Sequence, residues 1–113
     1  MIIDHRTYRL LPGRTPAQLE LYGKLAYPVQ LRYMGEPLCY LASESGALNT
    51  LVHCWVYESA GDREQKRAAM MNDPDWKHFL VENAKAGNMV EQSTMLMTSA
   101  PFAPPIPMPK IKR

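Results

Sequence analysis

Long hydrophobic runs are missing from this sequence of 113 residues. No apolar stretch approaches the roughly 18 residues that a membrane-spanning helix needs, and the first residues lack the apolar core of a secretory signal peptide. We therefore expect a cytoplasmic protein without a membrane span. An excess of charge of one sign is missing as well, because 13 Lys and Arg stand in mixed order with 11 Asp and Glu. We expect no nucleic-acid binding, since this normally needs a basic stripe or face.

Nucleotide-binding and hydrolase motifs are also absent from the sequence. It contains no phosphate-binding loop, no dinucleotide-binding glycine motif and no Gly-x-Ser-x-Gly elbow. Its three histidines, His5, His53 and His78, and its two cysteines, Cys39 and Cys54, lack the close spacing of zinc ligands. We expect no metal and no bound cofactor, with haem ligation by His53 as an alternative. The two thiols are expected to be reduced, buried, structural neighbours across a hairpin.

The residues that are present are typical of one globular domain. Hydrophobic residues make up 46% of the chain and charged residues 21%, close to the average for folded proteins. Five of the ten prolines fall within residues 101–109. We therefore divide the chain into a domain of residues 1–100 and a Pro-rich C-terminal arm of residues 101–113. The arm is expected to be extended and to dock on protein, that of a partner subunit, through Phe102 and Ile106.

Hydrophobic spacing and turn residues predict the element order β-α-β-β-α-β. The predicted elements are a strand over 2–11, a helix from Thr15 that breaks near Pro28 to Gly35, two hairpin strands over 38–44 and 48–57, a two-piece helix from Ser59 to Gly87, and a last strand over 89–99. This order is typical of an α+β, ferredoxin-like fold with a four-stranded antiparallel sheet and helices on one face.

The predicted strand over 48–57 has two faces of different character. One face is small and apolar and carries Thr50, Val52, Cys54 and Val56, whereas the other is aromatic and polar and carries Asn49, Leu51, His53, Trp55 and Tyr57. Helices of one chain cover only one side of a sheet. We expect a second subunit to cover the aromatic and polar face, which gives a homodimer through the open sheet face.

Several short motifs occur in an order that resembles the NIPSNAP family. They are Arg6-Thr7-Tyr8 followed by Pro12-Gly13, then His53-x-Trp55-x-Tyr57, Glu58-Ser59, and Asp75-Trp76 with Phe79. The resemblance extends from about Ile2 to Phe102. It implies a ferredoxin-like domain that pairs into a dimeric α/β barrel, similar to small monooxygenase-like proteins, but it implies no agreed catalytic residue. His5, where the family tends to have an aliphatic residue, and the Pro-rich tail depart from the pattern.

Six side chains are candidates for one pocket, because the first strand and the strand over 48–57 are neighbours in this topology. Arg6 would bind an anion, His53 would act as a base, Tyr8 and Tyr57 would orient a ligand, and Asn49 and Trp55 would line its walls. This set favours binding or transformation of a small hydrophobic or aromatic molecule in a cleft of the dimeric barrel, by cofactor-free oxygenase or isomerase chemistry. The alternative is a non-catalytic dimeric interaction or scaffold protein.

Two further expectations concern charge. Burial beside aromatic rings lowers the pKa of a histidine, whereas a nearby carboxylate such as Asp4 raises it, so the direction at His53 reports its surroundings. The charged run Arg63, Glu64, Lys66 and Arg67 is expected to form the solvent-exposed face of the second helix.

Overall fold

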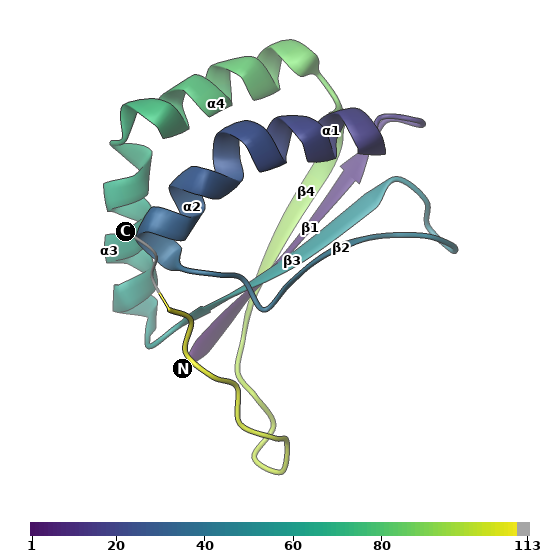
Figure 1. The fold of residues 1–113 in the computed structure, drawn as a ribbon. Coiled ribbons are helices and arrows are strands. Elements are labelled where there is room, and N and C mark those ends of the chain that lie inside the picture. The colour runs from purple at the N-terminus through teal and green to yellow at the C-terminus, as the bar shows by residue number, and fades with distance from the viewer. Residues whose placement is uncertain (111–113) are drawn as a thin grey trace.

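The protein folds as a single sheet covered by helices on one side. The structure is a computed structural model and describes residues 1–110. Its elements are β1 (Ile2–Leu10), α1 (Thr15–Leu21), the π-helical turn η1 (Tyr22–Ala26), α2 (Tyr27–Met34), β2 (Cys39–Ala42), β3 (Thr50–Tyr57), α3 (Ala60–Met71), α4 (Pro74–Ala86) and β4 (Met89–Met97). The strands lie in the order β2-β3-β1-β4 and all neighbours are antiparallel (Figure 1). The predicted α+β, ferredoxin-like fold is confirmed.

The first helix ends within the predicted range of Pro28 to Gly35, and it continues through Pro28 before it does so. Segments α1, η1 and α2 follow one another without interruption from Thr15 to Met34. Proline lacks an N–H group and its ring crowds the carbonyl of the preceding turn. The wider π-helical turn stands directly before it and provides that space. The helix ends at Gly35, whose φ of 77° and ψ of −169° belong to a region that only glycine adopts readily.

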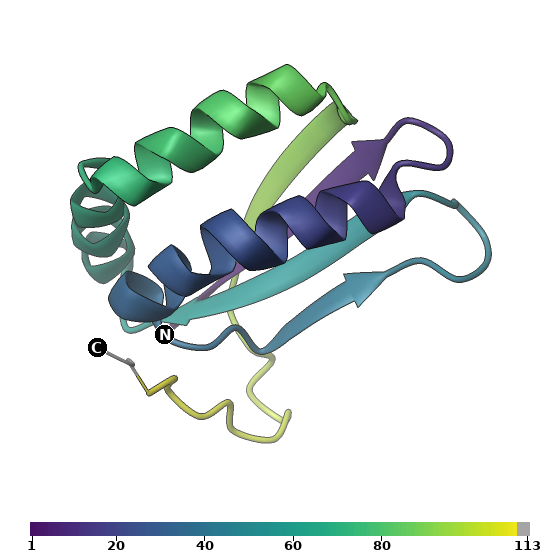
Figure 2. The ribbon, with the colours of Figure 1, turned by 45° about the horizontal axis from the view of Figure 1, so that its top comes forward.

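The second helix is divided into two pieces, as predicted. The side chain of Ser59 accepts a hydrogen bond from the Asp62 backbone N–H at 3.1 Å and caps α3. After α3, the Asp73 side chain caps α4 in the same way, by accepting from the Asp75 N–H at 2.8 Å, and Pro74 begins the helix. Figure 2 shows the first helix, from α1 to α2, and α4 above the same side of the sheet.

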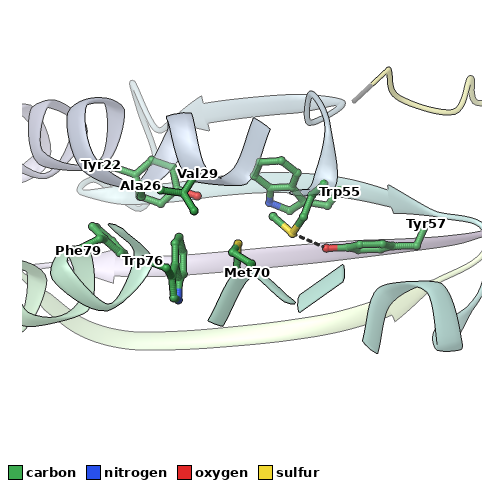
Figure 3. Packing of buried hydrophobic residues seen from close by; sticks show 9 residues of the cluster. Tyr22, Ala26, Val29, Trp55, Tyr57, Met70, Trp76 and Phe79 are labelled. Carbon is green, nitrogen blue, oxygen red and sulfur yellow. Dashed lines mark hydrogen bonds between the residues drawn. The ribbon is translucent and has the colours of Figure 1, made fainter. Parts of the chain in front are cut away.

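The aromatic and polar face of β3 lies under these helices, contrary to the prediction. Leu51, His53, Trp55 and Tyr57 are at most 1% exposed. Trp55 and Tyr57 pack with Tyr22, Ala26, Val29, Met34, Met70, Trp76 and Phe79 in one apolar core (Figure 3). The expectation that a second subunit covers this face is therefore wrong. Large aromatic side chains offer the helices more apolar area to bury than the small side chains opposite them.

The small side chains of β3 face away from the helices and belong to an open sheet face. Cys39 pairs directly with Cys54 across the hairpin, as predicted, and both thiols are free. They are half-buried, less than expected, because no helix covers this side. Leu41 and Met95 on the flanking strands are each 55% exposed. We call the side that carries these residues the open sheet face.

The C-terminal arm returns to its own chain. Gly35 has no Cβ atom, and a Cβ atom placed there would lie only 2.8 Å from the carbonyl oxygen of Lys110. The arm therefore packs closely on Gly35. The predicted anchor Phe102 is 92% exposed and contacts little of this chain, whereas Ile106 is half-buried. The expected docking on a partner stays a prediction. Residues 111–113 of the arm lie outside the described residues.

Candidate functional site

A cavity of about 630 Å³ lies between the sheet and the helices. Its walls come from β1, β2, β3 and β4 on one side and from the first helix, α3 and α4 on the other. The lining residues are Arg6, Tyr8, Leu10, Gln18, Tyr22, Gln30, Tyr40, Leu51, Arg67, Met71, Trp76, Phe79, Leu80, Asn83, Ala84, Gly87, Met89 and Gln92. Most of them are apolar or aromatic, and the few polar groups are amides, phenols and guanidinium groups. This is the composition of a small-molecule site.

Two of the six predicted site residues line this cavity. Arg6 and Tyr8 are two positions apart in β1, so their side chains point to the same side of the sheet, toward the helices. The Arg6 Nε donates a hydrogen bond to the Tyr8 hydroxyl at 2.9 Å, and the Arg6 Nη1 donates to Asp4 at 3.4 Å. The guanidinium group is thereby fixed at the cavity wall with part of its donor edge unused.

His53 lies beneath the cavity lining rather than in it. Its ring is stacked between those of Tyr8 and Tyr40, with centroid distances of 5.1 and 4.5 Å. Burial, with smaller contributions from the charges of Arg6 and Arg67, lowers the pKa of His53 to about 3. This agrees with the direction expected for burial beside aromatic rings. The imidazole is therefore neutral at physiological pH.

The hydrogen bonds of His53 also fix its tautomer. The Trp55 indole N–H donates to His53 Nδ1 at 2.5 Å. An indole nitrogen only donates, so Nδ1 carries no proton and the single proton of the neutral ring is on Nε2. Nε2 is buried and has no hydrogen-bond partner among the residues that the structure describes. In this arrangement His53 presents no free lone pair, and it supports the rings of Tyr8 and Tyr40 from behind. An imidazole enclosed in this way also does not fit a haem iron.

The remaining three predicted residues have structural surroundings. Trp55 and Tyr57 belong to the core, where the Tyr57 hydroxyl contacts the Met34 sulfur at 2.9 Å and burial raises the pKa of Tyr57 to about 12. Asn49 precedes β3 with a φ of 57°, and its side-chain oxygen accepts from the Gly13 N–H at 3.1 Å. It connects two loops at the sheet end and lies outside the cavity lining.

Tyr22, Tyr40 and Arg67 are among the cavity-lining residues that the sequence interpretation missed. Tyr22 and Tyr40 supply aromatic walls, and burial raises the pKa of both phenols, which keeps them protonated hydrogen-bond donors. Arg67, expected on the solvent-exposed face of α3, lines the cavity as well. Its spacing from Met70 and Met71, three and four positions along the helix, was the available signal, since such residues share a helix face.

The cavity can bind and stabilise an anionic oxygen, but it offers no evident base. Among its lining residues, all of which the structure describes, there is no His, Asp, Glu or Cys. Guanidinium and phenol groups in a partly enclosed site favour negative charge on a bound molecule. Within residues 1–110, no three His, Cys, Asp or Glu side chains gather as a metal site requires. Over the same residues, no helix is long and apolar enough to cross a bilayer.

Comparison with known proteins gives matches over almost the whole chain. The NIPSNAP family model matches residues 3–104. The crystal structure of protein Atu4242 from Agrobacterium tumefaciens superposes with a TM-score of 0.85 and 34% sequence identity, over 94% of this chain and 100% of that one. A NipSnap homologue of Dictyostelium discoideum is 29% identical over 91 residues, which is 80% of this chain. The chain spans only 40% of that relative's length.

The same architecture occurs in more distant proteins. A putative antibiotic biosynthesis monooxygenase from Nitrosomonas europaea superposes with a TM-score of 0.63 at 14% identity, over 88% of this chain and 98% of that one. At this identity the similarity concerns the fold alone. The match of the family model from the first strand to the start of the arm, together with the close Agrobacterium structure, shows that this chain belongs to the NIPSNAP family.

Proposed function

We propose that this NIPSNAP chain binds a small, largely apolar molecule, with room for an aromatic ring, in the cavity between its sheet and its helices. The observation that carries the proposal is the cavity itself. Its volume of about 630 Å³ falls within the range of known small-molecule sites. Tyr22, Trp76 and Phe79 offer ring surfaces, and Arg6 with Tyr8 offers a hydrogen-bonding group at one wall.

The reaction class that this cavity favours is one that passes through an anionic oxygen. Arg6 at the wall would stabilise an enolate or phenolate, and the protonated Tyr40 would donate to it, whereas Tyr22, whose hydroxyl already donates to Gln30 Oε1, would exclude water from it. Cofactor-free oxygenases and isomerases use such intermediates. In this proposal His53 is a positioning residue behind Tyr8, because it does not line the cavity.

The proposed assembly is a homodimer through the open sheet face. Leu41 and Met95 are 55% exposed and Met97 is 45% exposed on this side, next to the half-buried Val52 and Cys54. Exposed apolar side chains of this kind on a small chain favour association. A second copy placed face to face would cover it and leave each helix–sheet cavity on the outer side of the pair.

The cavity is tested by filling it from α4. Ala84→Phe places a ring in the cavity from an exposed helix position, so it should fold normally and weaken binding of the neutral fluorescent probe N-phenyl-1-naphthylamine at least tenfold. The matched control is Val81→Phe, which adds the same ring to the same helix at a position outside the lining. Fluorescence titration measures both. Equal probe affinity in the two variants contradicts the proposed site.

The dimer is tested by charging the open sheet face. Sedimentation is expected to show a dimer at micromolar concentration and a folded monomer for Met95→Glu, since an unpaired carboxylate would be buried at the interface. Leu96→Glu is the matched control, because Leu96 is similarly exposed but points to the opposite side of β4. A monomeric wild-type chain, or equal dissociation of both variants, would count against this assembly.

A further inference from the structure

Arg67 is a cavity-lining cation that has no hydrogen-bond or ion-pair partner in the described part of the chain. It lies one turn after Arg63 on α3 and is half-buried at the cavity wall, beside Met71. Among residues 1–110 no hydrogen bond or ion pair joins its guanidinium group to another side chain. Half-buried guanidinium groups are normally paired, because removing a charge from water is unfavourable unless hydrogen bonds replace the lost solvent.

The charges around Arg67 increase this imbalance. Burial lowers the pKa of Arg67, and the positive charges of Arg6 and Arg63 lower it further. The nearby carboxylate is Asp4, which is 0% exposed and already accepts from Arg63 Nε at 2.9 Å and Arg6 Nη1 at 3.4 Å through one oxygen. Two guanidinium groups therefore bind one oxygen of Asp4, Arg67 adds a third positive charge nearby, and the surplus positive charge lies at the cavity wall.

The positive charge of Arg6 and Arg67 lies at one end of the cavity, away from Leu10 and Met89 at the other end. Arg6 precedes Leu10 by four residues in β1, a distance of about 13 Å along a strand. Leu10 lies next to Met89, at the far end of the cavity lining. The amides of Gln18 and Asn83, which bond each other at 2.9 Å, also line the cavity. A ligand that fills the cavity would therefore meet uncharged side chains at one end and the two arginines at the other.

We propose that Arg6 and Arg67 together bind the carboxylate of an aromatic or otherwise apolar acid whose ring occupies the remaining cavity. The inference rests on the proposed function and specifies its ligand class. A carboxylate matches the planar donor edge of a guanidinium group and would complete the hydrogen bonding of Arg67. The negative charge of the ligand would also balance the positive charge of the arginines that the single carboxylate of Asp4 does not neutralise.

The test uses two ligands of equal shape and different charge. At neutral pH, 2-naphthoate is an anion and 2-naphthamide is its neutral counterpart, and each is titrated against bound N-phenyl-1-naphthylamine. We expect the wild-type protein to bind 2-naphthoate about tenfold more tightly than 2-naphthamide, the ratio that one charge-assisted hydrogen bond supplies. Arg67→Gln should remove this preference, and Arg67→Lys should retain part of it.

Lys77→Gln is the matched control, because it removes one positive charge from an exposed position on α4 outside the cavity lining. It should leave the tenfold ratio unchanged. Equal affinities of the two naphthalene ligands in the wild-type protein, with probe binding intact, overturn this inference and leave the proposed function standing. Absence of probe binding to the wild-type protein overturns both.

A stability measurement separates a ligand-binding role of Arg67 from a structural one. Without ligand, Arg67 sits beside two other cations and has no hydrogen-bond or ion-pair partner among residues 1–110, so Arg67→Gln should leave the melting temperature unchanged or raise it. A melting temperature lowered by several degrees would show that Arg67 supports the fold, and would overturn the assignment.

Discussion

Asp4→Asn is expected to lower the free energy of unfolding by about 3 kcal/mol, the loss typical of breaking a buried ion pair from one side. Asp4 is fully buried in β1 and holds the guanidinium groups of Arg6 and Arg63 through one oxygen. The asparagine keeps the shape and a weaker acceptor but removes the charge. Two half-buried cations then face each other, with Arg67 nearby and no carboxylate between them.

Denaturant unfolding followed by tryptophan fluorescence measures this loss, at a fixed protein concentration because dimerisation would contribute to stability. Asp4→Asn combined with Arg63→Gln should recover at least half of it, since the second change removes one of the uncompensated charges. Glu91→Gln is the control, because Glu91 on β4 forms an exposed ion pair with Arg9, which lies on β1 like Asp4, and this change should cost about 0.5 kcal/mol or less. A loss below about 1 kcal/mol for Asp4→Asn contradicts the structural role of this carboxylate.

Asp4 therefore couples the fold to the candidate site. Its carboxylate fixes Arg6 at the cavity wall and draws Arg63 from α3 down onto the sheet. The helix position one turn after Arg63 brings Arg67 to the cavity. The same ion pairs that join α3 to β1 thus place positive charge where a ligand would bind.

The sequence was sufficient for the element order because each element carries its own local signal. Ser59 and Asp73 cap the two pieces of the second helix, and the turn around Gly46 determines the register that pairs Cys39 with Cys54. Alternation in β3 correctly grouped His53 with Trp55. It did not determine which side the helices cover, because a period of two is unchanged when the sheet is turned over.

The candidate site was predicted only in part, for reasons of the same kind. Arg6 and Tyr8 could be grouped from strand alternation and were expected in a pocket, and both line the cavity. Arg67 was missed because long cationic side chains occur on wet helix faces and at buried edges alike, and its charged neighbours Arg63, Glu64 and Lys66 outweighed its spacing from Met70 and Met71. Tyr40 was missed because its strand is short, although the hairpin register that pairs Cys39 with Cys54 also places Tyr40 directly opposite His53.

Acidification is expected to destabilise the folded protein through His53. The pKa of His53 is about 3 in the folded protein and near 6.5 in an unfolded chain. Between these values the unfolded chain binds a proton that the folded protein does not bind. Stability therefore falls as the pH is lowered through this window, by roughly 1.4 kcal/mol for each pH unit. Above pH 6.5 both states are neutral, and His53 adds no further slope.

His53→Asn removes the titratable imidazole and keeps a side-chain oxygen that can accept a hydrogen bond from the Trp55 indole N–H. Between about pH 6 and about pH 4 the wild-type protein should lose roughly 2 to 3 kcal/mol more than this variant does. His78→Asn, at an exposed position of α4, should lose stability in parallel with the wild type. The comparison uses slopes, so a uniform loss from disturbed stacking on Tyr8 and Tyr40 does not affect it.

A direct titration completes this test should the variant fail to fold. The imidazole signals of His53 in the nuclear magnetic resonance spectrum should stay constant from about pH 8 to about pH 5, because burial and the two arginines keep the ring neutral. A midpoint near 6.5 would show that His53 is open to solvent. It would then be able to exchange protons with a bound ligand, and the assignment of His53 as a positioning residue behind Tyr8 would be wrong.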